Sequence, residues 1–307
     1  MLAGNNLAAL YVLELLVAAV DLSDVLVIAP EPGRPSPWQA SLASHAERLG
    51  VPYLSPREVN DEKIMRLVEQ HGPGLLLSVY YTQIFRPGLL EAVAGPALNF
   101  HPSLLPRHRG VAPLIWAIVE GDATTGVTVH HIDEGIDTGR IVLQYRIPIH
   151  ADDTGYVLHR KVAKLVRAAA AELLRTYLAG SGIPRGEEQS GIATYHSPRD
   201  PQVNHLDWSW PTRRIRDVVR ALAPPLPGAF SLLNGEELLI ARVEPVPQFD
   251  ERSKKPPGMV ELRRGQPPIV WALDGPLRLL EFVHGKDVVR GDELPGRRGL
   301  AEGQLLT

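Results

Sequence analysis

An asparagine and a histidine stand two residues apart in the stretch Asn99-Phe-His-Pro-Ser. If residues 97–101 form a strand, both side chains leave the same face, because side chains alternate along a strand. Pro102 and Pro106 stiffen the loop that follows and withhold two backbone donors. An amide and an imidazole presented together at the end of a strand are candidates for catalysis. The simpler alternative is a capped strand that carries a polar asparagine and a surface histidine.

A second stretch, Asp133-Glu-Gly-Ile-Asp-Thr-Gly139, is a loop with two aspartates and a central glycine. Asp137 beside His101 would favour the imidazolium form of that histidine. The alternative is a turn in which Asp137 makes only a local hydrogen bond to its own backbone. Residues 110–128 between the two stretches read as a helix, a loop and a strand, which could bring the two together.

The elements that must position these residues alternate between helix and strand as far as about residue 180. Apolar periodicity predicts strands at 24–29, 75–80, 97–101, 127–132 and 140–147. It predicts helices at 7–19, 38–49, 58–69 and 154–179, the last with Asp152 or Asp153 as its N-cap. Such alternation indicates an α/β fold with a mostly parallel, Rossmann-like sheet that binds ligands beyond the carboxyl ends of its strands.

The composition and the apolar pattern of the sequence change after this region. Residues 181–205 are polar and rich in glycine and proline, which predicts a linker. After a helix at 212–222, Asn234-Gly235 and Asp274-Gly275 predict two hairpins between short strands. We therefore predict a catalytic domain at 1–180, a linker at 181–205 and a smaller C-terminal β-barrel (OB-like) domain at 206–307.

Composition narrows the classes of function. The 307 residues hold 32 Lys and Arg against 35 Asp and Glu, with no strongly basic stripe, which argues against nucleic acid as a partner. The sequence has no cysteine, so disulfides and thiolate metal sites are excluded. Because no apolar run reaches the ~20 residues of a membrane helix and no secretory signal is recognisable, we expect no membrane partner and a cytoplasmic location.

The quoted residues carry a family resemblance. Asn-x-His-x-Ser-Leu-Leu-Pro-x-x-Arg-Gly, then Gly-Asp-x-x-Thr-Gly-Val-Thr, then Asp-x-Gly-x-Asp-Thr-Gly run without a gap from Asn99 to Gly139. This stretch resembles the signature of 10-formyltetrahydrofolate-dependent formyltransferases. Weaker similarity extends over most of the chain, including Leu206-Asp-Trp and 220–229. The resemblance implies the formyltransferase fold with an open C-terminal β-barrel.

The resemblance also implies an activity and a site. The family's catalytic residues correspond to Asn99, His101 and Asp137, the co-substrate is 10-formyltetrahydrofolate, and no metal is required. The residues that correspond to the folate-binding positions are Ile84, Phe85, Ser103, Leu104, Leu105, Pro106, Asp133, Glu134 and Gly135. In the implied reaction a neutral amine attacks the formyl carbon, Asn99 and protonated His101 donate to the oxyanion, and Asp137 keeps His101 charged.

One departure concerns the start of the chain. The family's first strand normally precedes the glycine that corresponds to Gly4, and here almost nothing precedes it. We therefore expect either a shortened first strand or a start that lies inside the natural chain, with consequences for the edge of the fold and none for the catalytic motif.

The amine acceptor is left open by the sequence. Methionyl-tRNA enzymes of this family carry a basic loop after the second strand, whereas 31–42 contains one basic residue, so tRNA is an alternative. We favour a nucleotide-linked amino sugar, because aromatic residues at a pocket wall suit sugar stacking. An amino acid or natural-product precursor, a formyl-folate hydrolase and a non-catalytic folate binder are further alternatives, and a homodimer stays open. The residues expected to contact the acceptor are Trp38, Tyr80, Tyr81, His108 and Trp116.

Overall fold

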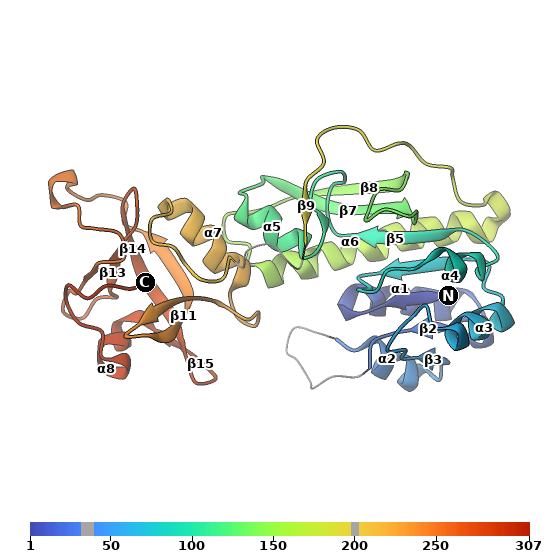
Figure 1. The fold of residues 1–307 in the computed structure, drawn as a ribbon, viewed down its shortest axis with the longest axis horizontal. Coiled ribbons are helices and arrows are strands. Elements are labelled where there is room, and N and C mark those ends of the chain that lie inside the picture. The colour runs from blue at the N-terminus through green and yellow to red at the C-terminus, as the bar shows by residue number, and fades with distance from the viewer. Residues whose placement is uncertain (32–39, 198–202) are drawn as a thin grey trace. The chain divides into compact units, whose positions relative to one another are not determined.

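The computed structural model describes residues 1–31, 40–197 and 203–307, so Trp38 lies outside the described residues. The chain divides into two compact units (Figure 1). One unit comprises Met1–Leu114, Thr124–Pro148 and His159–Pro198, and the other comprises Ile115–Ala123, Ile149–Leu158 and Arg199–Thr307. Each unit is described separately below.

The first unit is built on a seven-stranded sheet in the order β3-β2-β1-β4-β5-β7-β8. The first five strands of this order are parallel to one another. β7 pairs antiparallel with β5, and β8 pairs antiparallel with β7. The mostly parallel sheet predicted from the sequence is thereby confirmed. The strands are β1 (Leu2–Gly4), β2 (Val27–Ile28), β3 (Tyr53–Leu54), β4 (Leu76–Val79), β5 (Ala97–His101), β7 (Thr124–His131) and β8 (Ile141–Pro148).

Helices connect these strands, and local signals fix several of their ends. Ser41 Oγ accepts from the backbone N–H of Ser44 at the start of α2, and α2 ends at Gly50 in the left-handed conformation. Asp61 caps α3 in the same way, and Gly72 ends it. The helices are α1 (Asn6–Ala19), α2 (Leu42–Leu49), α3 (Glu62–His71), α4 (Pro87–Glu91), α5 (Pro113–Val119) and α6 (Gly155–Thr176), with a 3-10 turn η1 (Leu22–Asp24) and a π-helical turn η2 (Tyr177–Ser181).

Two predicted elements differ from the observed ones for local reasons. The strand predicted at 24–29 is only Val27–Ile28, because the η1 turn is closed by a bond from Asp24 N to Asp21 O (3.0 Å). The first turn of α6 is capped by Thr154, whose Oγ1 accepts from Val157 N (3.2 Å). Asp153, expected as the cap, instead accepts from the backbone N–H of His150 (2.9 Å).

The expected short first strand is present as β1. It lies in the middle of the sheet, with β2 on one side and β4 on the other. Gly4 pairs with Val79, and a Cβ atom at Gly4 would lie 2.6 Å from the Val79 carbonyl oxygen. Glycine therefore allows the close approach of two strands whose carboxyl ends lead into the candidate site.

The second unit contains the antiparallel sheet expected of the C-terminal module. Its order is β10-β11-β14-β13-β12, with β15 paired to β14. The predicted Asn234-Gly235 hairpin joins β10 and β11, and both turn residues have positive φ. The elements are α7 (Thr212–Leu222), β10 (Ala229–Leu233), β11 (Glu236–Pro245), η3 (Glu251–Ser253), β12 (Val260–Glu261), β13 (Ile269–Trp271), β14 (Pro276–His284), β15 (Asp287–Arg290), η4 (Gly291–Glu293) and α8 (Leu294–Arg298).

A two-stranded parallel ladder completes the description of the first unit. It joins β6 (Arg109–Gly110) to β9 (Tyr195–His196), which follows the polar segment after α6. Among the described residues, no helix is both long and apolar enough to cross a lipid bilayer.

Candidate active site

Asn99 and His101 lie on one face of β5 and meet Asp137 there. Asn99 Nδ2 donates to Asp137 Oδ1 (3.1 Å), and His101 Nδ1 lies 3.3 Å from Asp137 Oδ2. The backbone N–H of Gly110 also donates to Oδ2 (2.8 Å). The structure thus brings together the three side chains that the sequence placed at the reacting centre.

Asp137 reaches this position because the loop after β7 folds back over the sheet. Asp137 itself has a φ of 55°, a left-handed conformation that aspartate tolerates better than most residues. Within the loop, the Asp133 carboxylate accepts from Gly135 N (3.1 Å) and from the Thr138 hydroxyl (2.6 Å). A Cβ atom at Gly135 would lie 2.0 Å from Thr138 Oγ1, so glycine is required for this closed turn.

Gly139 ends the loop against the neighbouring strand and offers a test of how far loop geometry controls the site. A Cβ atom at this position would lie 1.7 Å from the His131 carbonyl oxygen. We expect Gly139→Ala to lower the free energy of unfolding by about 1–3 kcal/mol and to lower turnover, because the backbone two residues from Asp137 must move. Chemical denaturation and steady-state kinetics of the same preparation would measure both effects.

Gly296→Ala is the matched control, since a Cβ atom at Gly296 meets nothing within 4 Å. The same substitution there should leave both stability and turnover close to those of the parent protein. Equal behaviour of the two variants would show that the close packing at Gly139 does not support the site.

Burial and the neighbouring groups shift the pKa values of Asp137 and His101 in opposite directions. Burial alone would raise the pKa of Asp137, but the His130 and His101 rings, which are protonated at the pH where this carboxyl titrates, and the Gly110 N–H together lower it to about 2. Burial lowers the pKa of His101, and this effect exceeds the opposing effects of Asp137 and the His108 carbonyl. Asp137 thus favours the charged form of His101, and the burial of this ring, which is only 4% exposed, opposes that effect.

Both ring nitrogens of His101 are engaged. Nε2 lies 2.8 Å from the His108 carbonyl oxygen, which can only accept, so Nε2 carries a hydrogen. His108 adopts a φ of 56°, which orients this carbonyl, and its buried side chain lies 3.1 Å from His196 of β9. The histidine expected to contact the acceptor thus contributes its backbone to the site and points its side chain into the protein.

Two further residues join the site without having been predicted there. His130 of β7 places Nε2 3.2 Å from Asn99 Nδ2 and 3.4 Å from Asp137 Oδ1. Gln189 donates to the carbonyl oxygens of Asp137 and Gly139 (2.8 Å each) and accepts from Arg109. His130 joins the site through the pairing of Asn99 with His130 across β5 and β7, a register that the sequence does not specify. Gln189 lies in the polar segment that the sequence analysis treated as a linker.

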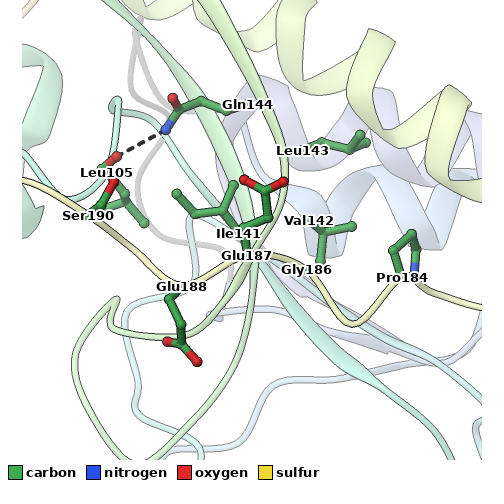
Figure 2. A pocket seen from close by; sticks show the side chains of 10 residues that line it. All are labelled: Leu105, Ile141, Val142, Leu143, Gln144, Pro184, Gly186, Glu187, Glu188 and Ser190. Carbon is green, nitrogen blue, oxygen red and sulfur yellow. Dashed lines mark hydrogen bonds between the residues drawn. The ribbon is translucent and has the colours of Figure 1, made fainter.

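The loop at 103–106 is held rigidly beside these residues. Thr128 Oγ1 donates to Ser103 O (2.7 Å) and accepts from Leu105 N (3.1 Å), and Gln144 donates to Leu105 O (3.1 Å). Figure 2 shows Gln144 reaching toward Leu105 at one wall of a pocket of about 670 Å³. The other walls are formed by Ile141–Leu143 of β8 and by the segment after α6. The residues of that segment that line the pocket are Pro184, Gly186, Glu187, Glu188 and Ser190.

The other residues expected to bind folate border an apolar cluster. Phe85 is buried and stacks on Tyr81, with 5.3 Å between ring centroids, and Ile132 packs against the same cluster just before the Asp133 loop. Ile84 is 65% exposed and Ile136 is 53% exposed. The two loops therefore present apolar side chains to solvent, while Glu134 and Gly135 are exposed between them.

The aromatic residues expected at the acceptor differ in position. Tyr80 follows β4 with a φ of 56°, and its ring lies edge-on to His159, with centroids 5.5 Å apart. Burial raises the pKa of both Tyr80 and Tyr81, the latter to about 12. Trp116 lies in the part of α5 that clusters with the second unit, so its role stays a prediction.

Residues 17–174 match the family model described as formyl transferase, and residues 199–296 match the formyl transferase C-terminal domain. The N-formyltransferase from Helicobacter canadensis, solved with folinic acid and dTDP-3-aminofucose, superposes with a TM-score of 0.69 at 23% identity, covering 91% of this chain and 97% of its own.

Two further solved structures share the fold. WlaRD, a sugar 3N-formyl transferase solved with dTDP and 5-N-formyl-THF, has a TM-score of 0.70 at 22% identity, covering 90% of this chain and 95% of its own. A sugar N-formyltransferase from a Shewanella species has a TM-score of 0.60 at 21% identity, covering 78% of this chain and 94% of its own.

Proposed function

Because the chain belongs to the formyl transferase family, we propose that it transfers a formyl group from 10-formyltetrahydrofolate to the primary amine of a nucleotide-linked amino sugar. The observation that carries this proposal is the contact of Asn99 and His101 with the two oxygens of one partly buried carboxylate, Asp137. An amide donor, an imidazole and an aspartate at one point supply the groups that acyl transfer to an amine requires.

The first step forms a bond between the amine nitrogen and the formyl carbon, and the carbonyl π electrons move to the oxygen. The Asn99 amide donates a hydrogen bond to the resulting oxyanion. The amine nitrogen now carries an extra proton, and N10 of the folate must gain one as its bond to the formyl carbon breaks. The Asp137 carboxylate, which faces His101 Nδ1, takes the amine proton and passes it to that ring nitrogen, giving a transient imidazolium that Asp137 stabilises. The Nε2–H of His101 then supplies the proton that N10 gains, and the ring afterwards regains its resting hydrogen position.

The lowered pKa of His101 suits this role. A ring that is already charged at neutral pH could not accept the proton of the attacking amine, and burial keeps the neutral form available. Its Nε2–H is held by the His108 carbonyl in the resting protein. A charged oxyanion is a stronger acceptor than a carbonyl, so the intermediate can compete for this hydrogen.

The folate fits the apolar and backbone groups on one side of the carboxylate. We assign its ring system to the surface between Ile84 and the loop 133–137, where exposed isoleucine side chains would be covered by a flat heterocycle. Phe85 would form the floor of this surface, and Ser103–Pro106 would bound it. No metal is needed for the steps above.

The acceptor is assigned to the carboxyl ends of β1 and β4, next to β5. The Asn6 side-chain oxygen and the Tyr80 hydroxyl are buried there without a hydrogen-bond partner among the described residues, and a bond from Asn5 N to Val79 O (3.1 Å) ties the two segments together. Buried polar groups are almost always satisfied, so these two atoms favour a ligand rich in hydroxyl groups. Of the sugar enzymes that share the fold, the Helicobacter canadensis protein was solved with dTDP-3-aminofucose and WlaRD with dTDP.

The test is release of tetrahydrofolate from 10-formyltetrahydrofolate, followed by absorbance against a panel of amines. The panel holds several dTDP- and UDP-linked amino sugars, free amino acids and charged initiator tRNA. Turnover with a sugar nucleotide and none with tRNA supports the proposal. Turnover with tRNA alone would overturn the choice of acceptor, and release without any acceptor would indicate a hydrolase.

A further inference from the structure

His130 is a buried imidazole that contacts two of the three side chains of the proposed site but belongs to neither sequence motif. Its ring is 3% exposed and lies between the Asn99 amide and its own strand. The atoms that face Nδ1 and Nε2 of His130 determine which of these two nitrogens carries the ring hydrogen.

Nδ1 of His130 lies 2.8 Å from the His131 carbonyl oxygen. A carbonyl can only accept, so Nδ1 carries the hydrogen and the neutral ring presents a lone pair at Nε2. The Asn99 atom 3.2 Å from Nε2 must then be a donor. A hydrogen on each ring nitrogen would instead direct one N–H toward Asp137 Oδ1 (3.4 Å) and also toward the Asn99 nitrogen (3.2 Å), which cannot accept it.

Asp137 demands the same orientation of the amide. Its Oδ1 atom, also an acceptor only, lies 3.1 Å from Asn99 Nδ2. Two independent acceptors therefore select the amide nitrogen, and exclude the amide oxygen, at this position. Without His130, only the hydrogen bond to Asp137 would keep the Asn99 amide from rotating by 180°.

The angle between the two acceptors leaves one hydrogen of Asn99 for the reaction. The three separations, 3.2, 3.1 and 3.4 Å, put Nε2 and Oδ1 about 65° apart as seen from Nδ2. The hydrogens of a trigonal amide nitrogen are roughly 120° apart. One hydrogen can be shared between acceptors so close together, while the other points away from both.

We propose that His130 is a positioning residue for formyl transfer, whose Nε2 fixes the Asn99 amide so that one N–H is shared with Asp137 and the other faces the formyl oxygen. This inference rests on the proposed function, in which Asn99 donates to the oxyanion. His130 acts only through Asn99.

The test compares two substitutions at the same position. His130→Leu and His130→Gln both lose the bond to the His131 carbonyl, but only the glutamine keeps a polar group that can accept from Asn99. We expect His130→Leu to lower kcat by about 10- to 100-fold with KM for both substrates unchanged, as is typical when a residue that orients a catalytic group is lost. His130→Gln should remain within a few-fold of the parent protein.

His131→Leu is the matched control. His131 is the adjacent residue of β7, and its Nε2 binds the Pro184 carbonyl (2.9 Å) away from Asn99. Its kcat should match that of the parent protein. Equal losses in His130→Leu and His130→Gln, or no loss in either, would overturn the proposal.

A second readout does not depend on turnover. In ¹⁵N-labelled protein, hydrogen exchange of the Asn99 side-chain amide should be faster in His130→Leu than in the parent protein and unchanged in His131→Leu. If no amine in the panel is formylated, the proposed function fails, and unchanged exchange in His130→Leu would separately overturn the positioning role.

Discussion

Asp137→Asn is expected to lower kcat by about 1000-fold or more while the protein still folds. The carboxylate accepts hydrogen bonds from the Asn99 amide and the Gly110 N–H and lies beside His101, so either orientation of an asparagine amide turns a donor toward a donor. The loss of negative charge also removes the group that stabilises the transient imidazolium. Removing the aspartate that orients a catalytic histidine has an effect of this size elsewhere. Asparagine tolerates the left-handed φ of 55°, so the backbone need not change.

The difference in stability between the parent protein and Asp137→Asn should depend on pH. The pKa of Asp137 in the folded protein is about 2, against an ordinary value of 3.8, so its charge stabilises the native state at pH values above about 4. This contribution, about 2 kcal/mol, disappears as pH falls through 2. Denaturant titrations of the parent protein and of Asp137→Asn should therefore give a difference in unfolding free energy at pH 7 that becomes smaller at the lowest pH where both proteins fold. Turnover near that of the parent protein would contradict the assignment of Asp137.

His101→Gln is expected to lower kcat by at least about 100-fold, because glutamine cannot accept and return a proton near neutral pH. The glutamine amide can still donate to the His108 carbonyl, which His101 Nε2 satisfies in the parent protein. Folding should therefore survive. Single-turnover mixing with both substrates would separate loss of the chemical step from weaker binding.

His101→Ala separates the catalytic effect from the structural one. It leaves the buried His108 carbonyl without its donor and should reduce the free energy of unfolding by about 1–3 kcal/mol more than His101→Gln. Similar loss of turnover in both variants, despite different stabilities, would assign the loss to the imidazole. Wild-type turnover in the glutamine variant would remove His101 from the mechanism.

Local sequence signals predicted the parts of the fold that depend on neighbouring residues. β5 spans the predicted residues 97–101, and α7 spans the predicted residues 212–222. Both are set by short-range apolar periodicity and by adjacent proline residues. Thr154 capped α6 in place of the predicted aspartates, because Asp153 is bound to the turn that precedes the helix.

The contacts that complete the site depend on residues distant in the sequence. His130 joins Asn99 only because of the register between β5 and β7, which no local pattern specifies. The lowered pKa of His101 depends on the burial of its ring, which outweighs the nearby carboxylate and cannot be read from the sequence. The side chain of His108, expected to contact the acceptor, is buried against His196, because the distant strand β9 packs beside it.

The segment that follows α6 has a consequence for dissecting or recombining this enzyme. Gln189 binds the Asp137 and Gly139 carbonyls, the Thr194 hydroxyl accepts from His108 N (2.8 Å), and His196 O accepts from Val111 N (2.9 Å). A piece excised at residue 180, where the composition changes, would lose every one of these bonds. The smallest transplantable catalytic module therefore extends at least to His196, and a chimera joined earlier in the chain would inherit a loose Asp137 loop.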